Sequence, residues 1–455
     1  MLRHPEINFF ASVTKKTARQ IAKEPCLAFL PSFIKRLPQA SIYLVGGAIR
    51  DFLLKKTSKD YDFVIAGLKP HQLEVELKNL GQVDLVGRNF GVYKFQPRDA
   101  DPQKCEPLDF ALPRTEQALP DSRGGYRDFA AQIDETIQIE ADLARRDFTI
   151  NALAFDVVNH RLIDPFNGRN DLKRKLIRCV GNPAERFAED LSRVLRAIRL
   201  AAELNFKIEN QTWEALKQAG RQLNTQRLAA DGQTEYVVPR ETVGAEISRA
   251  LAANHANALA LLFESGLLSQ IFPEIQLLLN ERKDYLKPVI EASASDPTVI
   301  ASLIYRDLPA DLIKDTLRRN GLAALPQNHK DRIHEDEVAW IAAYLQSAID
   351  PEKLSLSEIE QTFMNGRGER LIQTMSGLHQ SDRLAAIERQ IKNIRIIWPK
   401  QIPKLVTGED VLAQGLDPSP QIKEILNRIR DAQLAGRVTN REQALSLLKN
   451  QTRHR

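Results

Sequence analysis

Two short segments decide the fold of the amino-terminal part of this chain: Leu44-Val45-Gly46-Gly47-Ala48-Ile49-Arg50-Asp51 and Lys59-Asp60-Tyr61-Asp62-Phe63-Val64-Ile65. The glycine pair ends a strand-like apolar run and opens a helix-like run. Because side chains alternate across a β-strand, Asp60 and Asp62 are expected to project from one face of a second strand. The sequence therefore predicts a strand, a glycine turn and a helix, beside a strand that carries two carboxylates.

The paired carboxylates and the glycine turn predict a site for a metal ion and phosphates. Two carboxylates on one face repel each other unless a cation lies between them, and Mg²⁺ prefers oxygen ligands while keeping waters or substrate phosphates. Backbone N–H groups at the Gly46-Gly47 turn and at the start of the following helix can bind phosphate oxygens. An Asp-x-Asp pair alone is common on protein surfaces, but its combination with the turn indicates nucleotidyl transfer.

A third carboxylate would complete a site of the two-metal kind. Asp109 is the best candidate, because it lies in another strand-like run. Glu106 and Glu116 are weaker candidates. An ordinary acid at the end of a strand explains Asp109 equally well.

Composition places the chain among ordinary globular proteins. Its 455 residues are too many for one core, and a net charge of +5, from 64 basic and 59 acidic residues, permits RNA binding without demanding it. The three cysteines, Cys26, Cys105 and Cys179, are far apart and odd in number, so we expect buried free thiols and neither a disulfide nor a zinc site. No apolar run approaches the roughly 18 residues of a membrane helix and no export signal is evident, so we expect a cytoplasmic protein that does not contact membranes.

The pattern of apolar residues in the sequence changes near Leu172. Before it, short β-branched runs alternate with turns; these runs are Ser41–Val45, Tyr61–Ile65, Val92–Phe95 and Leu108–Ala111. After it, apolar residues recur at helical spacing, and the polar stretch 229–239 predicts a loop between two helices. We predict an α+β protein with an amino-terminal extension (1–39), a head with a mixed sheet and helices (40–166), and an all-helical neck (167–275), body (276–400) and tail (401–455).

A second motif is Asp142-Leu143-Ala144-Arg145-Arg146-Asp147-Phe148-Thr149-Ile150-Asn151-Ala152. Its adjacent arginines offer donors for phosphates, and the acid, hydroxyl and amide groups that follow offer acceptors for ribose hydroxyls. The alternative is the start of a helix that is capped by Asp147 or Thr149. Capping alone does not require the arginine pair.

A third motif, Glu189-Asp190-Leu191-Ser192-Arg193-Val194-Leu195-Arg196-Ala197-Ile198-Arg199, is predicted as a helix with one apolar and one charged face. One interpretation is a surface helix with Glu189–Arg193 and Asp190–Arg193 ion pairs, each worth about 0.2–0.5 kcal/mol. In the other, Asp190 accepts a hydrogen bond from a base amino group while Arg193 donates to the ring, as in base readout by proteins. Arg196 and Arg199 would then reach a triphosphate.

The three motifs, in this order and at these spacings, resemble the tRNA nucleotidyltransferase (CCA-adding)/poly(A) polymerase family, class II of the polymerase-β-like nucleotidyltransferases. The similarity is strong over Ile42–Phe206 and weaker to Glu274. A thinner match resumes at Val406–Leu412 and continues through Gly436 to Glu442. It implies a polymerase-β-like nucleotidyltransferase head, a nucleobase-selecting helix in the neck, and a tail that contacts tRNA.

The resemblance also implies a role for each motif residue. Catalysis would fall to Asp60, Asp62 and Asp109, with Asp60 and Asp62 binding Mg²⁺. Phosphate binding would fall to Gly46, Gly47, Arg50, Arg196 and Arg199. Ribose binding would fall to Arg146, Asp147 and Asn151, and base selection to Glu189, Asp190 and Arg193. A flexible loop at 116–128, with Arg123, Gly124, Gly125 and Arg127, would help switch selection from C to A.

In the activity that this resemblance implies, CMP and AMP are added to the 3′ end of tRNA without a nucleic-acid template. The RNA 3′-hydroxyl attacks the α-phosphorus of CTP or ATP, and pyrophosphate leaves. The sequence does not predict the oligomeric state. It contains no His-Asp dipeptide, so we expect no second activity of the metal phosphohydrolase kind.

Three alternatives stay open. A specialist that adds only A, or only CC, shares the motifs, although CC-adding members typically have a shorter loop than this chain. Poly(A) polymerases also share them, but Val86–Phe95 resembles the tRNA-directed branch and we find no long basic tail. A helical RNA-binding module without activity would explain the basic balance but not the Asp60/Asp62 pair.

Overall fold

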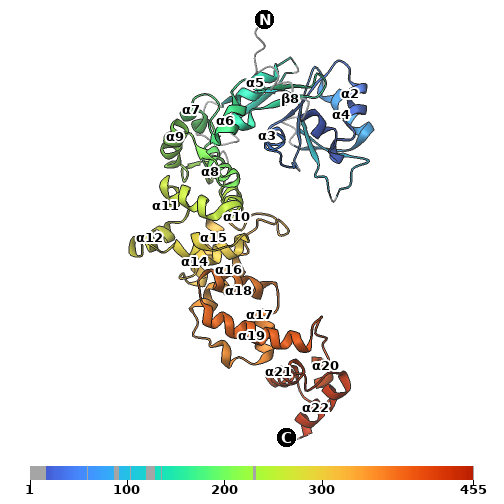
Figure 1. Ribbon diagram of the computed structural model, residues 1–455, viewed down its shortest axis with the longest axis vertical. Coiled ribbons are helices and arrows are strands. Elements are labelled where there is room, and N and C mark those ends of the chain that lie inside the picture. Colours follow the sequence, from blue (N-terminus) through green and yellow to red (C-terminus); the bar gives the residue numbers. More distant parts are fainter. Residues whose placement is uncertain are drawn as a thin grey trace. The chain divides into compact units, whose positions relative to one another are not determined.

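The computed structural model describes residues 17–58, 60–86, 92–102, 104–118, 129–134, 136–228 and 232–453 of the chain (Figure 1). They form two compact units. One comprises residues up to Ala250 together with Ala260–Ile271, and the other comprises Leu251–Leu259 with Phe272–Arg455. The predicted division into extension, head, neck, body and tail is finer than these two units and stays a prediction.

A seven-stranded sheet in the order β3-β4-β5-β2-β1-β8-β9 forms the centre of the first unit. The strands are β1 (Ser41–Val45), β2 (Asp62–Ala66), β3 (Gly81–Val86), β4 (Val92–Pro97), β5 (Leu108–Ala111), β8 (Ala154–Asp156) and β9 (Arg161–Ile163). The β2 and β5 strands run parallel, and the other neighbouring pairs run antiparallel. This mixed sheet confirms the predicted α+β class, and all four predicted strands are present.

Helices and two-stranded sheets, of which the β10–β11 sheet is parallel, complete the first unit. The helices are α2 (Leu30–Arg36), α3 (Gly47–Leu53), α4 (Pro70–Leu80), α5 (Ile139–Ala144), α6 (Gly168–Arg174), α7 (Pro183–Glu189), α8 (Ser192–Leu204), α9 (Asn210–Gly220), α10 (Arg240–Glu264) and α11 (Leu267–Ile271). The middle of α10, Leu251–Leu259, belongs to the second unit. The two-stranded sheets pair β6 (Arg114–Ala118) with β7 (Phe129–Ile133), β10 (Leu176–Ile177) with β11 (Lys207–Ile208), and β12 (Gln226–Leu228) with β13 (Thr234–Tyr236). The stretch 229–239 is therefore not entirely a loop, because it contributes β13. The prediction of an all-helical neck at 167–275 is also wrong in detail, because β10 to β13 lie within that range.

The β2 strand is covered on both faces, which explains its apolar run. Phe63 stacks on Phe110 of β5 with ring centroids 4.8 Å apart, and Phe33 of α2 packs edge-on against Phe110. Val64 points to the other side, where it belongs to a buried cluster with Leu143 of α5. Because successive side chains alternate, this packing fixes which way each residue of β2 faces. Asp62 is the first residue of this central strand, and it therefore lies where β2 enters the sheet; we call this end of β2 the edge of the sheet.

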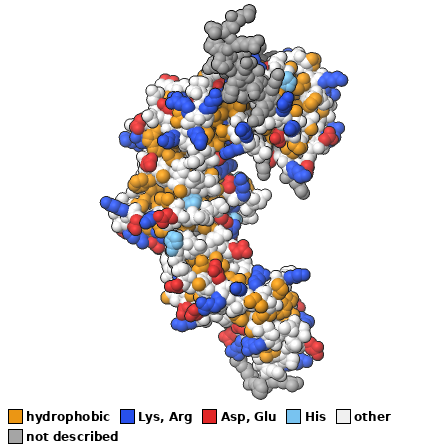
Figure 2. Space-filling view, in the orientation of Figure 1, with side chains coloured by type: hydrophobic (Ala, Val, Ile, Leu, Met, Phe, Trp, Pro, Cys, Tyr) orange, Lys and Arg blue, Asp and Glu red, His pale blue; other side chains and the backbone are white. Residues whose placement is uncertain are grey.

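The second unit is helical, as predicted. Its helices are α12 (Pro273–Glu281), α13 (Lys287–Glu291), α14 (Pro297–Tyr305), α15 (Ala310–Arg319), α16 (Glu335–Gln346), α17 (Leu356–Phe363), α18 (Gly366–Gly377), α19 (Ser381–Ile397), α20 (Gly408–Leu412), α21 (Pro420–Leu434) and α22 (Arg441–Arg453). On the face seen in Figure 2, basic and acidic side chains are interspersed over this unit. No helix within the described ranges is long and apolar enough to cross a membrane.

Two of the three cysteines are joined, which corrects the prediction of three free thiols. Cys26 and Cys105 form a disulfide, with Cα atoms 5.6 Å apart although 79 residues separate them in the sequence. Cys26 lies in the turn before α2, and Cys105 lies just before β5, so the packing of α2 on the sheet brings the two together. Spacing in a sequence does not reveal such a long-range contact. Cys179 is free and buried.

Candidate active site

The turn between β1 and α3 requires glycine for two reasons. Gly46 has φ +74° and ψ −137°, a backbone conformation that L side chains rarely adopt. A Cβ atom at this position would also lie 2.9 Å from Arg146 Nη1 and 3.4 Å from Asp62 Oδ2. The turn therefore brings the first two motifs into contact.

The two carboxylates of the first motif lie together at the amino-terminal end of β2. Asp62 is the first residue of the strand, and Asp60 precedes the strand and is exposed. Partial burial raises the pKa of Asp62 to about 6, with the charges of Asp60 and Asp109 acting in the same direction and Arg146 opposing them. The pKa of Asp60 is also raised, by loss of hydration first and then by Asp109 and Glu106. This edge therefore carries more negative charge than its neighbours neutralise.

Asp109 lies where a third carboxylate was predicted, but it already has a partner. It is directly opposite Asp62 in the parallel β2–β5 register. Lys94 of β4 donates to Asp109 Oδ1 at 2.7 Å, and this bond raises the pKa of Lys94. Sequence analysis missed Lys94, whose facing position follows only from the antiparallel register of β4 on β5.

Both arginines of the second motif, Arg145 and Arg146, lie next to the carboxylate of Asp142 in α5, which is fully buried. Arg145 donates to Asp142 Oδ1 through Nε at 3.0 Å and Nη2 at 2.7 Å. Arg146 is held less tightly, since its Nη2 lies 3.6 Å from Asp142 Oδ2 and its buried Nε finds no hydrogen-bond partner among the described residues. The Arg146 guanidinium is thus placed between Asp142 and the Gly46 turn, ready to donate to a ligand.

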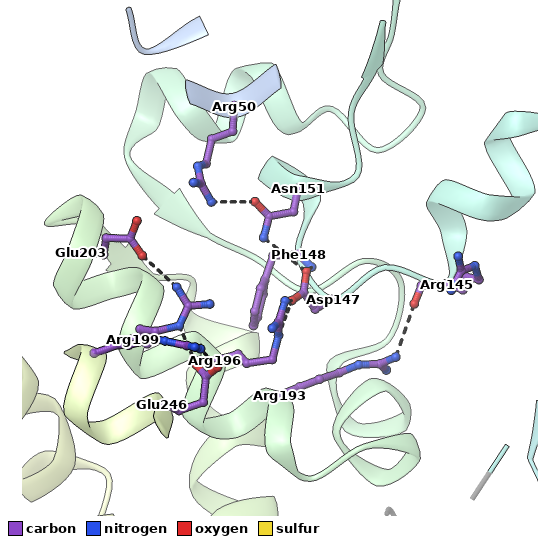
Figure 3. Close-up of polar contacts among 11 residues, drawn as sticks. Arg50, Arg145, Asp147, Phe148, Asn151, Arg193, Arg196, Arg199, Glu203 and Glu246 are labelled. Atoms are coloured by element: carbon purple, nitrogen blue, oxygen red, sulfur yellow. Dashed lines mark hydrogen bonds and ion pairs between the residues drawn. The ribbon is translucent and has the colours of Figure 1, made fainter. Parts of the chain in front are cut away.

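Asp147 is buried at the centre of a polar network (Figure 3). Arg196 of α8 donates to Asp147 Oδ2 through Nε at 2.8 Å, and the Phe148 N–H donates to Oδ1 at 2.8 Å. Burial opposes ionisation of Asp147, but the charge of Arg196 and these hydrogen bonds outweigh it and lower the pKa of Asp147 to about 2. The same pair raises the pKa of Arg196. Asp147 therefore stays ionised.

Asn151 extends this network to the first motif. Its amide nitrogen lies 3.4 Å from Asp147 Oδ1, and its Oδ1 accepts a hydrogen bond from Arg50 Nη1 at 3.0 Å. Arg50 is buried, is also bonded to Asp51, and directs its Nη2 towards Gly47. The alternative of a capped helix here is wrong, because only the single 3₁₀ turn Thr149–Asn151 follows and it has no side-chain cap.

The third motif is not one helix, contrary to prediction. The α7 helix ends at Glu189, Asp190 is extended with φ −146° and ψ 103°, and α8 begins at Ser192. Asp190 Oδ1 accepts from the Ser192 N–H at 2.9 Å, while Arg193 Nη1 pairs with Glu189 Oε2 at 2.7 Å. The predicted Glu189–Arg193 pair is thus confirmed, whereas Arg193 pairs with Glu189 and not with Asp190. Arg193 Nη1 also donates to the Arg186 carbonyl at 2.8 Å, and both Asp190 and Arg193 line the cavity described below.

Further along α8, Arg199 is held by two carboxylates (Figure 3). Its Nε donates to Glu246 Oε2 of α10 at 2.6 Å, and its Nη1 donates to Glu203 Oε2 at 2.8 Å. Sequence analysis did not predict Glu246 as part of this site. Its contact joins residues 47 positions apart.

Most of these residues line one cavity of about 660 Å³. The predicted residues that line it are Gly46, Gly47, Arg50, Asp60, Asp62, Arg146, Asp147, Asn151, Asp190, Arg193, Arg196 and Arg199. Residues that were not predicted also line it; these are Arg145, Leu200 and Arg249. Asp109 and Glu189 do not line the cavity. Asp109 accepts a hydrogen bond from Lys94, and Glu189 accepts one from Arg193. Arg123, Gly124, Gly125 and Arg127 lie outside the described residues.

The volume of this cavity is within the range of about 300–1,000 Å³ that small-molecule sites occupy. Its wall combines seven arginines with four aspartates, so it suits a ligand with several negative charges and a cation. All of its lining residues belong to the first unit.

Comparison with known sequences finds one family model and several curated relatives that resemble this chain. Residues 42–178 match the family model of the poly A polymerase head domain. The multifunctional CCA protein of Stenotrophomonas maltophilia is 37% identical over 241 residues, which are 52% of this chain and 52% of that protein. The multifunctional CCA protein of Xylella fastidiosa is 36% identical over 277 residues, 60% of this chain and 59% of that protein. The chain thus spans only half to three-fifths of the length of these curated relatives.

Solved structures match along nearly the whole chain. The crystal structure of the Bacillus stearothermophilus CCA-adding enzyme in complex with CTP superposes with a TM-score of 0.66 at 25% identity, covering 95% of this chain and 98% of that one. The Thermotoga maritima CCA-adding enzyme complexed with tRNA gives a TM-score of 0.57 at 20% identity, covering 99% and 96%, and this match concerns the fold alone. An α+β head followed by helices is therefore the architecture that these enzymes share with this chain.

Proposed function

Because the chain belongs to the tRNA nucleotidyltransferase and poly(A) polymerase family, we propose that it adds CMP and AMP to the 3′ end of tRNA. The reaction uses CTP and ATP, needs no nucleic-acid template and releases pyrophosphate. The observation that carries this proposal is the single cavity on which all three sequence motifs meet. We place this activity in the cytoplasm, as expected from the sequence.

Asp60 and Asp62 would hold Mg²⁺ at the edge of the sheet. The raised pKa values of both carboxylates fit a site that lacks a cation to neutralise it. Within the described ranges no group of three or more Asp, Glu, His and Cys residues forms a complete metal cage. Mg²⁺ needs none, because it is commonly bound by one or two carboxylates with waters and substrate phosphates. When bound, it positions the triphosphate and stabilises the charge on the reacting oxygens.

The remaining residues bind and orient the nucleotide. Asp147, ionised and fixed by Arg196, accepts hydrogen bonds from the ribose hydroxyls, and Arg146 donates to the phosphates beside the Gly46 turn. Asp190 and Arg193, on either side of the break before α8, present an acceptor and a donor to the edge of the base. Glu189 positions Arg193. Asp109, held by Lys94, stays our candidate for the third catalytic carboxylate.

The helical second unit is proposed to contact the tRNA. Scattered lysine and arginine side chains there would bind phosphates and so position the acceptor end without reading its sequence. This role rests on the resemblance to the family.

The proposal is tested by incubating the pure protein with tRNAs that end before CCA, after the first C and after CC. CTP and ATP are supplied singly and together with Mg²⁺, and products are resolved by length. Incorporation of two C residues and then one A onto the shortest tRNA is the expected result.

Other product patterns separate the alternatives. Addition of A only to the CC-ended tRNA would identify an A-adding specialist, and addition that stops after CC would identify a CC-adding one. A long run of A would identify a poly(A) polymerase. No incorporation on any RNA, with tRNA binding retained, would leave a binding module.

A further inference from the structure

Arg249 lies on the wall of the cavity but belongs to none of the three motifs. It is on α10, three residues after Glu246, and therefore on the same side of that helix. Its side chain is 42% exposed, and its Nη1 lies 3.7 Å from Glu246 Oε1, beyond hydrogen-bond distance. The cavity thus has a cation that approaches from a different helix than Arg193, Arg196 and Arg199.

Glu246 is already committed to another arginine. Its Oε2 accepts from Arg199 Nε at 2.6 Å, and Glu246 is buried in this position. Arg199 is held by hydrogen bonds to both Glu246 and Glu203, whereas Arg249 lies beyond hydrogen-bond distance of Glu246. The guanidinium of Arg249 is therefore the less constrained of the two and can donate to a ligand in the cavity.

The order of side chains along α8 indicates what Arg249 meets. Arg193, Arg196 and Arg199 are three residues apart, so they span about 9 Å along the helix axis at a rise of about 1.5 Å per residue. The base-selecting pair lies at the start of this row and the ribose acceptor Asp147 is at Arg196. Arg199 and its neighbour Arg249 therefore lie at the end farthest from the base, where an extended nucleotide has its phosphates.

We propose that Arg249 binds the terminal phosphates of the incoming nucleotide and of the pyrophosphate that leaves. This inference rests on the proposed function and deepens it by naming a further binding residue. Phosphate oxygens of the tRNA backbone have the same chemistry, but the position of Arg249 inside the nucleotide cavity favours the triphosphate. A guanidinium suits the task, because it can donate two parallel hydrogen bonds to one phosphate.

The test compares binding of CTP and of CMP, without tRNA and with Mg²⁺, to the wild type and to R249A. We expect CTP binding to weaken roughly 10-fold, as for the loss of a charge-assisted hydrogen bond, while CMP binding stays within about 2-fold. Pyrophosphate should compete with CTP less well in R249A by a similar factor. R249K should retain part of the affinity.

Lys217→Ala on α9 is the matched control, because Lys217 is a partly exposed cation of the same unit that pairs with Glu214 and does not line the cavity. Melting curves show whether each variant is folded. Unchanged CTP affinity in R249A, equal weakening of CTP and CMP, or weakening of tRNA binding alone would overturn the inference. If the wild type extends tRNA in any of these cases, the proposed function survives. If the wild type binds CTP but extends no RNA, only the proposed function fails.

Discussion

The two halves of the cavity, the Asp60/Asp62 edge and the α8 side, differ in how their carboxylates are neutralised. At the sheet edge, Asp60 and Asp62 lie together with raised pKa values, so their charges are incompletely compensated. At the α8 side, Asp147 has its pKa lowered to about 2 by Arg196 and by backbone hydrogen bonding. The difference fits our proposal, in which the arginine side is preorganised in the free protein and the acidic edge binds a cation.

Removing the acidic edge should have the largest effect. We expect Asp60→Ala and Asp62→Ala each to lower the rate of CMP incorporation by about 10³-fold, comparable to the loss of a major electrostatic contribution. The measurement is single-turnover incorporation with saturating CTP and tRNA. Because neither carboxylate is well compensated in the free protein, the melting temperature should not fall. Retention of more than a tenth of the rate in both variants would contradict the assignment.

The two halves meet at Gly46, so a methyl group there should have the next largest effect. Gly46→Ala forces a strained φ and places Cβ 2.9 Å from Arg146 Nη1, which moves Arg146 relative to Asp62. We expect kcat/KM for CTP to fall about 10²-fold. Gly266→Ala is the control, because Gly266 also has a positive φ (+78°) but no atom within 4 Å of its Cβ position. A similar loss of activity in both variants would show that backbone strain alone is responsible.

The acidic edge should also give the activity a dependence on pH and metal, with a smaller effect. Since the pKa of Asp62 is raised to about 6, protonation competes with metal binding below that pH, and the two carboxylates titrate as a coupled pair. At low Mg²⁺ concentration, the rate should fall several-fold between pH 7 and pH 5.5, and added Mg²⁺ should move the midpoint to lower pH. A midpoint that does not depend on Mg²⁺ would argue against these carboxylates as ligands.

The sequence predicted the local parts of this site well. The Gly46 turn, the Asp60/Asp62 pair and Asp147 follow from motifs of a few residues, and all of them line one cavity. The strands β1 and β5 were predicted to the residue, because their apolar runs are short.

What sequence analysis missed depends on contacts between distant residues. The Arg199–Glu246 pair, Lys94 on Asp109 and the Cys26–Cys105 disulfide each join positions that no local pattern relates. The break at Asp190 was missed for another reason. Helical periodicity continues through it, while the backbone of Asp190 is extended and its carboxylate accepts a hydrogen bond from the Ser192 N–H, where α8 begins.

The most direct test of the contrast between the two halves of the cavity is whether removing a carboxylate charge raises or lowers the stability of the protein. A carboxyl whose folded pKa lies above its unfolded value favours folding only while protonated; for Asp62 this contribution is present below about pH 4 and is lost as the pH rises through about 6. For Asp147 the contribution is present above about pH 4 and is lost as the pH falls towards 2.

The measurement is therefore the melting temperature of the first unit at pH 7.5, without Mg²⁺, in Asp62→Asn and Asp147→Asn. We predict that Asp62→Asn melts at or a few degrees above the wild type, whereas Asp147→Asn melts several degrees below it because Arg196 loses its partner. Equal destabilisation by the two substitutions would contradict the account.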